Sequence, residues 1–136
     1  MRVVLDTNVL VSAFLSPYGT CAEILRLVLA KRVTLILDFR IYNEYRDVLF
    51  RPSFHLNNKQ VSIVLETIYE FAENIIPNPV NKVFPDKDDR VFYEAAVSGK
   101  ADYLITGNKK HFPSPLCKDI AVASPSELLQ AYRSQT

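Results

Sequence analysis

Cysteine and histidine are scarce in this chain of 136 residues, which contains two of each. Cys21 and Cys117 have no CxxC spacing, so no disulfide framework is expected and each is predicted to be a small buried hydrophobe. Without a histidine pair or a cysteine cluster, the usual zinc and copper sites are excluded. A reducing compartment, the cytoplasm, is the simplest setting for such a chain.

Long apolar runs are also missing. The N-terminal run of Val3, Val4 and Leu5 ends at once in Asp6, which interrupts the apolar core that a signal peptide needs. No other stretch is long enough to cross a bilayer as a helix. We therefore expect no association with a membrane.

No excess of one charge marks the chain as a nucleic-acid binder. The 16 Lys and Arg nearly balance the 15 Asp and Glu, and the formal net charge is +1. If three of the acids share one metal site, 12 remain against the 16 basic residues. The rest of the surface would then be mildly basic, which favours docking of a phosphate backbone.

Strands and helices are predicted to alternate from end to end in one domain, residues 1–136. Strands are expected at 3–5, 33–37, 74–76, 103–105 and 120–123. Helices are expected at 8–15, 20–31, 38–50, 57–71, 86–98 and from 124 onward, with Thr20 and Ser124 as caps. This order predicts an α/β fold with three layers, α/β/α, around a central and mainly parallel sheet of about five strands.

Several polar positions are expected to meet at one edge of this sheet. Asp6 directly follows the first strand, and the stretch Thr106-Gly107-Asn108 directly follows the fourth. Glu44 and Asp89 lie in helices that leave the same edge. Because ligands of open parallel sheets bind beyond the carboxyl ends of the strands, these side chains should face one crevice.

Helix phase supports a shared site for Glu44 and Asp89. Glu44 borders the apolar stripe that contains Ile41 and Val48, and Asp89 lies one turn before Phe92, which marks the inner face of its helix. Carboxylates turned toward a core are costly unless a positive group meets them, and close carboxylates repel one another. Mg²⁺ or Mn²⁺ removes both penalties, because these ions prefer oxygen ligands and retain several waters. Phosphodiester hydrolysis is the natural chemistry of such a site.

Three motifs, taken in order, resemble the PIN-domain ribonucleases. They are Val4-Leu5-Asp6-Thr7-Asn8-Val9-Leu10, Asp86-Lys87-Asp88-Asp89-Arg90-Val91-Phe92, and Ala101-Asp102-Tyr103-Leu104-Ile105-Thr106-Gly107-Asn108. Glu44, within Tyr42-Asn43-Glu44-Tyr45, falls where the family has its intervening glutamate. The resemblance covers nearly the whole chain.

The resemblance implies a five-stranded parallel sheet and Mg²⁺- or Mn²⁺-dependent cleavage of RNA. Many small members of the family look like toxins of bacterial toxin–antitoxin pairs, which are often homodimers silenced by an antitoxin protein. The metal ligands that it implies are Asp6, Glu44 and Asp89. The supporting residues that it implies are Thr7 or Asn8, which would orient Asp6, and Thr106, which would hydrogen-bond within the cluster.

One position departs from the family pattern. After Thr106-Gly107 the family often has a fourth acid, and this chain has Asn108. An amide oxygen can still ligate an ion or position a water, but it brings no charge. Occupancy of a second metal position is therefore open, and Asp88 or Asp86 is available to compensate.

Each candidate residue also has an ordinary structural interpretation. Asp6 and Asp86 stand where acids cap helices, Glu44 can pair with Arg40, and the stretch at 106–108 can be a simple turn. The run Lys109, Lys110 and His111 either contacts RNA phosphates or forms a solvated loop. These interpretations must all hold separately, whereas one metal site explains four positions together.

Two other functions compete with a ribonuclease. A haloacid dehalogenase-type phosphatase also has an aspartate after its first strand, but it needs a second one two residues later, where this chain has Asn8. A non-catalytic or weakly active RNA- or protein-binding module is favoured by Asn108. The prediction we adopt is a metal-dependent endoribonuclease, the toxin of a toxin–antitoxin pair, acting in the cytoplasm as a homodimer.

Overall fold

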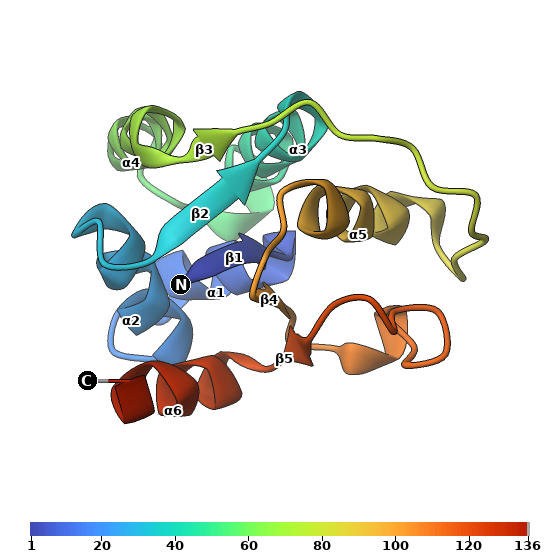
Figure 1. The fold of residues 1–136 in the computed structure, drawn as a ribbon. Helices are drawn as coiled ribbons and strands as arrows, with labels where there is room; N and C mark the ends of the chain where they lie inside the picture. Colours follow the sequence, from blue (N-terminus) through green and yellow to red (C-terminus); the bar gives the residue numbers. More distant parts are fainter. Residues whose placement is uncertain (136) are drawn as a thin grey trace.

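The computed structural model describes residues 1–135 and contains one five-stranded parallel sheet (Figure 1). Its strands lie in the order β3-β2-β1-β4-β5. Their bounds are Arg2–Leu5 for β1, Thr34–Leu37 for β2, Glu73–Asn74 for β3, Tyr103–Ile105 for β4 and Val122–Ala123 for β5. The predicted parallel α/β architecture is confirmed, and Thr136, the last residue of the predicted domain, lies outside the described residues.

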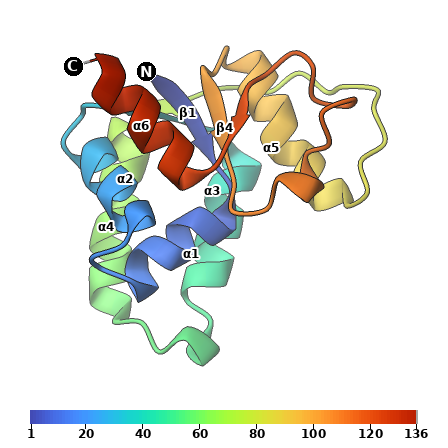
Figure 2. The same cartoon turned by 90° about the horizontal axis from the view of Figure 1, so that it is seen from below.

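Six α-helices and two short 3₁₀ turns surround the sheet in the described part of the chain. The bounds are α1 Thr7–Leu15, α2 Thr20–Leu29, α3 Phe39–Leu49, α4 Asn58–Phe71, α5 Lys87–Ser98 and α6 Pro125–Gln135, with η1 at Pro52–Phe54 and η2 at Lys109–His111. Figure 2 shows α5 on one side of β1 and β4, and α2, α4 and α6 on the other. Helix α3 contacts α1, α4 and α5, so it joins the two helical layers.

The middle strand of the sheet, β1, consists mainly of buried apolar residues. Val3, Val4 and Leu5 of β1 are all buried, as expected for a strand that is covered on both faces. Leu5 pairs with Ile105 of β4, so these two neighbouring strands end level with each other. The residues that follow them therefore lie side by side at one edge of the sheet.

Side chains cap the N-termini of α3, α4, α5 and α6, whereas α1 and α2 have no side-chain cap. Ser124 and Glu127 form a reciprocal capping box at α6, with bonds of 3.1 and 2.8 Å. The predicted cap at Thr20 is wrong, because Gly19 precedes the helix and no side chain caps it. α5 ends at Ser98 as predicted and is followed by Gly99, where a Cβ would lie 2.7 Å from Ile36 Cγ2 of β2. The glycine thus lets the helix end approach the sheet closely.

β1 begins one residue before its predicted start and β2 begins one residue after it, and two further strands differ more. β3 begins one residue earlier than expected, and β5 is limited to Val122 and Ala123. Both are edge strands, where apolar patterning is weak because only one side is paired. In the described residues, no helix is long and apolar enough to span a membrane.

Candidate functional site

Asp6 lies at the carboxyl end of β1 and is only 5% exposed. Its Oδ2 accepts a 2.8 Å hydrogen bond from the hydroxyl of Thr106, which directly follows the neighbouring strand β4. The Asp6 side chain makes no capping bond to helix α1, so the interpretation as a helix cap is wrong. The bond between the two strand ends holds the carboxylate at the predicted edge.

Glu44 joins the same edge from helix α3. The hydroxyl of Thr7, the first residue of α1, donates a hydrogen bond to Glu44 Oε2. Tyr45 helps to place this helix, because its buried hydroxyl donates a 2.5 Å bond to the carbonyl of Leu5 at the end of β1. The alternative ion pair between Glu44 and Arg40 is absent from the contacts of the described residues, and Arg40 binds other carboxylates.

Asp89 lies in the first turn of α5 and is 8% exposed. Its Oδ2 is buried without a hydrogen-bond partner among the described residues. The Nδ1 atom of His111 lies 3.7 Å from this oxygen, beyond hydrogen-bond distance. A buried carboxylate oxygen with no hydrogen bond is costly, so this atom is suited to a cation or a water.

Asn108 contributes differently from the prediction. Its side-chain Oδ1 accepts a 3.1 Å bond from the backbone N–H of Lys110 and so caps η2. Its Nδ2 lies 3.2 Å from His111 Nε2. The turn interpretation is thus correct for the oxygen of Asn108, while the amide nitrogen connects the turn to His111.

The remaining predicted residues lie outside this set of contacts. Asp86 caps α5 by accepting from the Asp88 N–H at 2.9 Å, and the Asp88 side chain is exposed. Asn8 is exposed too, and the supporting residue that forms a hydrogen bond is Thr7, which binds Glu44 rather than Asp6. Lys109 forms an ion pair with Glu127 of α6, and Lys110 is exposed.

Burial raises the pKa of each of the three site carboxyls. For Asp6, burial outweighs the lowering effect of the Thr106 hydrogen bond on the pKa. The pKa of Glu44 is raised first by burial and further by the charges of Asp6 and Asp88. The pKa of Asp89 rises to about 6, mainly through burial, with the charges of Asp6 and Glu44 adding to it. These mutual effects place the three groups in one negative field.

The donors fit a hard divalent ion that is held by few protein ligands. Within residues 1–135, no three histidine, cysteine or carboxylate groups lie close enough to enclose one ion, so the expected ligands Asp6, Glu44 and Asp89, with Asp88 available to compensate, do not form a preassembled metal site. Mg²⁺ needs only one or two carboxylates, because it keeps most of its waters. Asp6 and the unpartnered oxygen of Asp89 satisfy that requirement.

Comparison with known proteins decides the family. Residues 2–110 match the family model described as the PIN domain. The chain belongs to the PIN-domain family. This assignment confirms the resemblance seen in the sequence, and it decides against the haloacid dehalogenase-type alternative.

One relative of this PIN domain and one solved structure of similar fold extend the comparison. The "Uncharacterized protein MJ1680" of Methanocaldococcus jannaschii is 31% identical over 112 residues, which cover 80% of this chain and 72% of that protein. A chain in the crystal structure of VapBC2 from Rickettsia felis bound to a DNA fragment from their promoter superposes with a TM-score of 0.61. That match covers 91% of this chain and 98% of the other at 18% identity, so it shows the fold.

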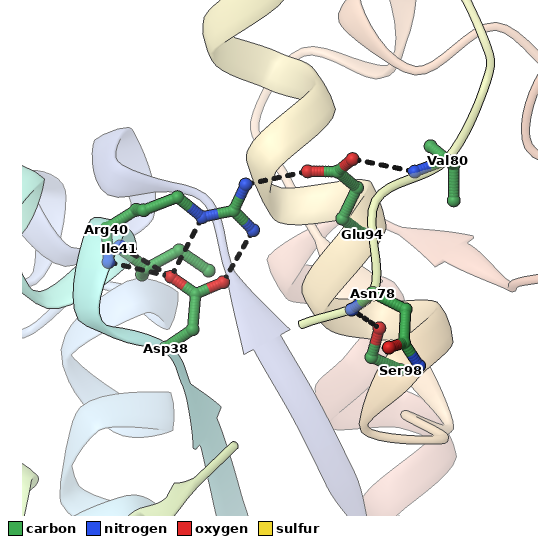
Figure 3. Close-up of polar contacts among 7 residues, drawn as sticks. All are labelled: Asp38, Arg40, Ile41, Asn78, Val80, Glu94 and Ser98. Carbon is green, nitrogen blue, oxygen red and sulfur yellow. Dashed lines mark hydrogen bonds and ion pairs between the residues drawn. The ribbon is translucent and has the colours of Figure 1, made fainter. Parts of the chain in front are cut away.

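A second polar cluster of this PIN domain escaped the sequence analysis (Figure 3). Arg40 donates to Asp38 at 2.8 Å and to Glu94 of α5 at 2.7 Å, and both carboxylates are almost fully buried. Glu94 also accepts a 2.8 Å bond from the backbone N–H of Val80. The available signal was Asp38, which directly follows β2 as Asp6 directly follows β1.

Proposed function

We propose that this PIN domain is a metal-dependent endoribonuclease and the toxin of a toxin–antitoxin pair. Family membership supports a nuclease. The unpartnered buried oxygen of Asp89, beside other carboxyls of raised pKa, is the observation that carries the proposal. Such an arrangement is costly for the protein alone and becomes favourable when a cation binds.

The residues have distinct roles in this proposal. Asp6 and Asp89 would hold Mg²⁺ or Mn²⁺, and Glu44 would add negative charge or accept a bond from an ion-bound water. Thr106 orients Asp6 and Thr7 orients Glu44 through their hydroxyls. When bound, the ion supplies a nucleophilic hydroxide and offsets charge on the scissile phosphate.

Removal and return of the metal tests the enzymatic proposal. We expect a chelator to abolish cleavage of labelled RNA, Mn²⁺ to restore it, and Asp6→Asn or Asp89→Asn to lower the rate by at least about a hundredfold. Asp47→Asn is the matched control, since Asp47 is an exposed aspartate on α3 that pairs with Arg51 away from the site. Cleavage that continues unchanged in both site variants would remove this mechanism.

A toxin role predicts a protein partner. The VapBC2 structure supports an antitoxin partner, and we extend this to a homodimeric toxin that binds RNA. We expect expression of the wild type to arrest bacterial growth, Asp6→Asn to relieve the arrest, and size-exclusion chromatography with light scattering to give twice the chain mass. Normal growth with active wild-type enzyme present would contradict the toxin role.

A non-catalytic binding module is the second candidate, and Asn108 favours it. The amide of Asn108 is uncharged, so it offers no fourth charge, and its oxygen already accepts a bond from the Lys110 N–H. RNA binding with a similar Kd in wild type and Asp89→Asn, without cleavage in Mn²⁺, would support this alternative over the nuclease.

A further inference from the structure

His111 lies between two residues of the candidate site. Its Nε2 is 3.2 Å from Asn108 Nδ2, and its Nδ1 is 3.7 Å from Asp89 Oδ2. The His111 side chain is 43% exposed and lies at the end of η2. The role proposed above for Asp89 leaves this histidine without a function.

The hydrogen positions along this chain of contacts follow from the donors. The backbone N–H of Lys110 can only donate, so the atom of Asn108 facing it must be the oxygen. The other end of the amide is therefore the NH₂ group, which can only donate, and His111 Nε2 must accept from it. A neutral imidazole that accepts at Nε2 carries its hydrogen on Nδ1, which faces Asp89.

We propose that Asn108 sets the tautomer of His111, and that His111 in turn acts as a positioning residue that directs an N–H at Asp89 Oδ2. The inference rests on the proposed function, because Asp89 matters here as a cation ligand. A carboxylate oxygen has two lone pairs, so Oδ2 can face the imidazole N–H with one and offer the other to the ion. The imidazole then keeps the Asp89 carboxylate in one orientation. Outer partners of this kind commonly change metal affinity by about 10–100-fold.

The same donors argue against His111 as a metal ligand. Ligation through Nδ1 would require the hydrogen to move to Nε2, where it would point at the NH₂ group of Asn108. Relief of that clash would require the amide to turn over and break the Lys110 bond. In this chain Asn108 and His111 therefore act as a pair, and a carboxylate at position 108 would select the opposite tautomer.

The tautomer can be measured without any ion. His55, which is exposed, is the only other histidine, so two imidazole signals are expected in long-range ¹⁵N–¹H spectra. At a pH where imidazole is neutral, we expect His111 to carry its hydrogen on Nδ1, and Asn108→Asp to move it to Nε2 or to add a second proton. An Nε2–H tautomer for His111 in the wild type would overturn the proposal.

Two substitutions then separate the two ring nitrogens. Asn carries its amide nitrogen near the position of imidazole Nδ1, whereas Gln carries it near Nε2. We expect His111→Gln to weaken Mn²⁺ binding, measured by calorimetry, by about tenfold or more, and His111→Asn to stay near the wild-type Kd. His55→Asn is the control for loss of a histidine, and thermal midpoints of all variants check folding.

The outcomes separate this inference from the proposed function. Equal Mn²⁺ affinity in the Gln and Asn variants would overturn the positioning role while leaving the nuclease proposal intact. Failure of the wild type to bind Mn²⁺ would overturn the proposed function and, with it, this role of His111.

Discussion

Two threonine hydroxyls hold two of the three site carboxylates. Thr106 donates to Asp6, and Thr7 donates to Glu44, in both cases from a buried position. Each bond occupies one carboxylate oxygen and limits the side chain to one orientation. The free oxygens are thereby presented to a ligand, which is a requirement of a site that must bind an ion without rearrangement.

Thr106→Val tests the first of these bonds. Valine has nearly the same shape but no donor, so the buried Asp6 carboxylate loses its hydrogen-bond partner. We expect the free energy of unfolding to fall by about 1–3 kcal/mol and RNA cleavage to weaken. Urea denaturation and the cleavage assay measure both effects. Thr106→Ser keeps the hydroxyl, and an equal loss in Ser and Val would show that packing rather than the bond is responsible.

Helices α3 and α5 bring Glu44 and Asp89 to the sheet edge, and a single arginine connects them. Arg40 on α3 binds Glu94 on α5, while Asp38 both caps α3 and binds Arg40 (Figure 3). Glu94 also accepts a hydrogen bond from the Val80 N–H, and this bond fixes the long segment before α5 to the helix. The relative placement of the two helices thus depends on a cluster outside the site.

Arg40→Met is predicted to damage this connection between the helices. It leaves two buried carboxylates without their positive partner, so we expect about 3–5 kcal/mol lower stability in chemical denaturation. Arg46→Met, at an exposed position of the same helix, should change stability by less than about 0.5 kcal/mol. Similar losses of stability in both variants would mean that the ion pairs of Arg40 contribute no more than an exposed arginine of the same helix.

The three site carboxyls make the stability of the whole molecule depend on pH. Burial raises the pKa of Asp6, Glu44 and Asp89 above their ordinary values, that of Asp89 to about 6. The folded protein therefore keeps these protons to higher pH than the unfolded chain does. In the ion-free protein, the contribution of these three carboxyls to the free energy of unfolding is therefore greatest below their ordinary pKa values. That contribution is lost as the pH rises through their raised pKa values.

Thermal unfolding in a chelator and in Mn²⁺ measures this effect. We expect the midpoint without metal to decline between about pH 4 and about pH 6 through these groups, and Asp89→Asn to flatten the decline. Mn²⁺ competes with the protons, so it should raise the midpoint more at about pH 7 than at about pH 5. A gain that is the same at both pH values would contradict the assignment of an ion to these carboxylates.

Local patterns in the chain were sufficient to predict most of the elements and to propose Asp6, Glu44 and Asp89 as candidate site acids. Apolar runs and helical periodicity depend on near neighbours, so β1, β4 and most helix bounds could be predicted, as could Asp6 beyond a strand end. Partner choice depends on packing between residues far apart in the chain. Thr7 meets Glu44 across 37 positions, and Arg40 meets Glu94 across 54. The sequence alone offers many polar side chains as possible partners for each of these residues. Only the tertiary structure decides which of them lie within hydrogen-bond distance.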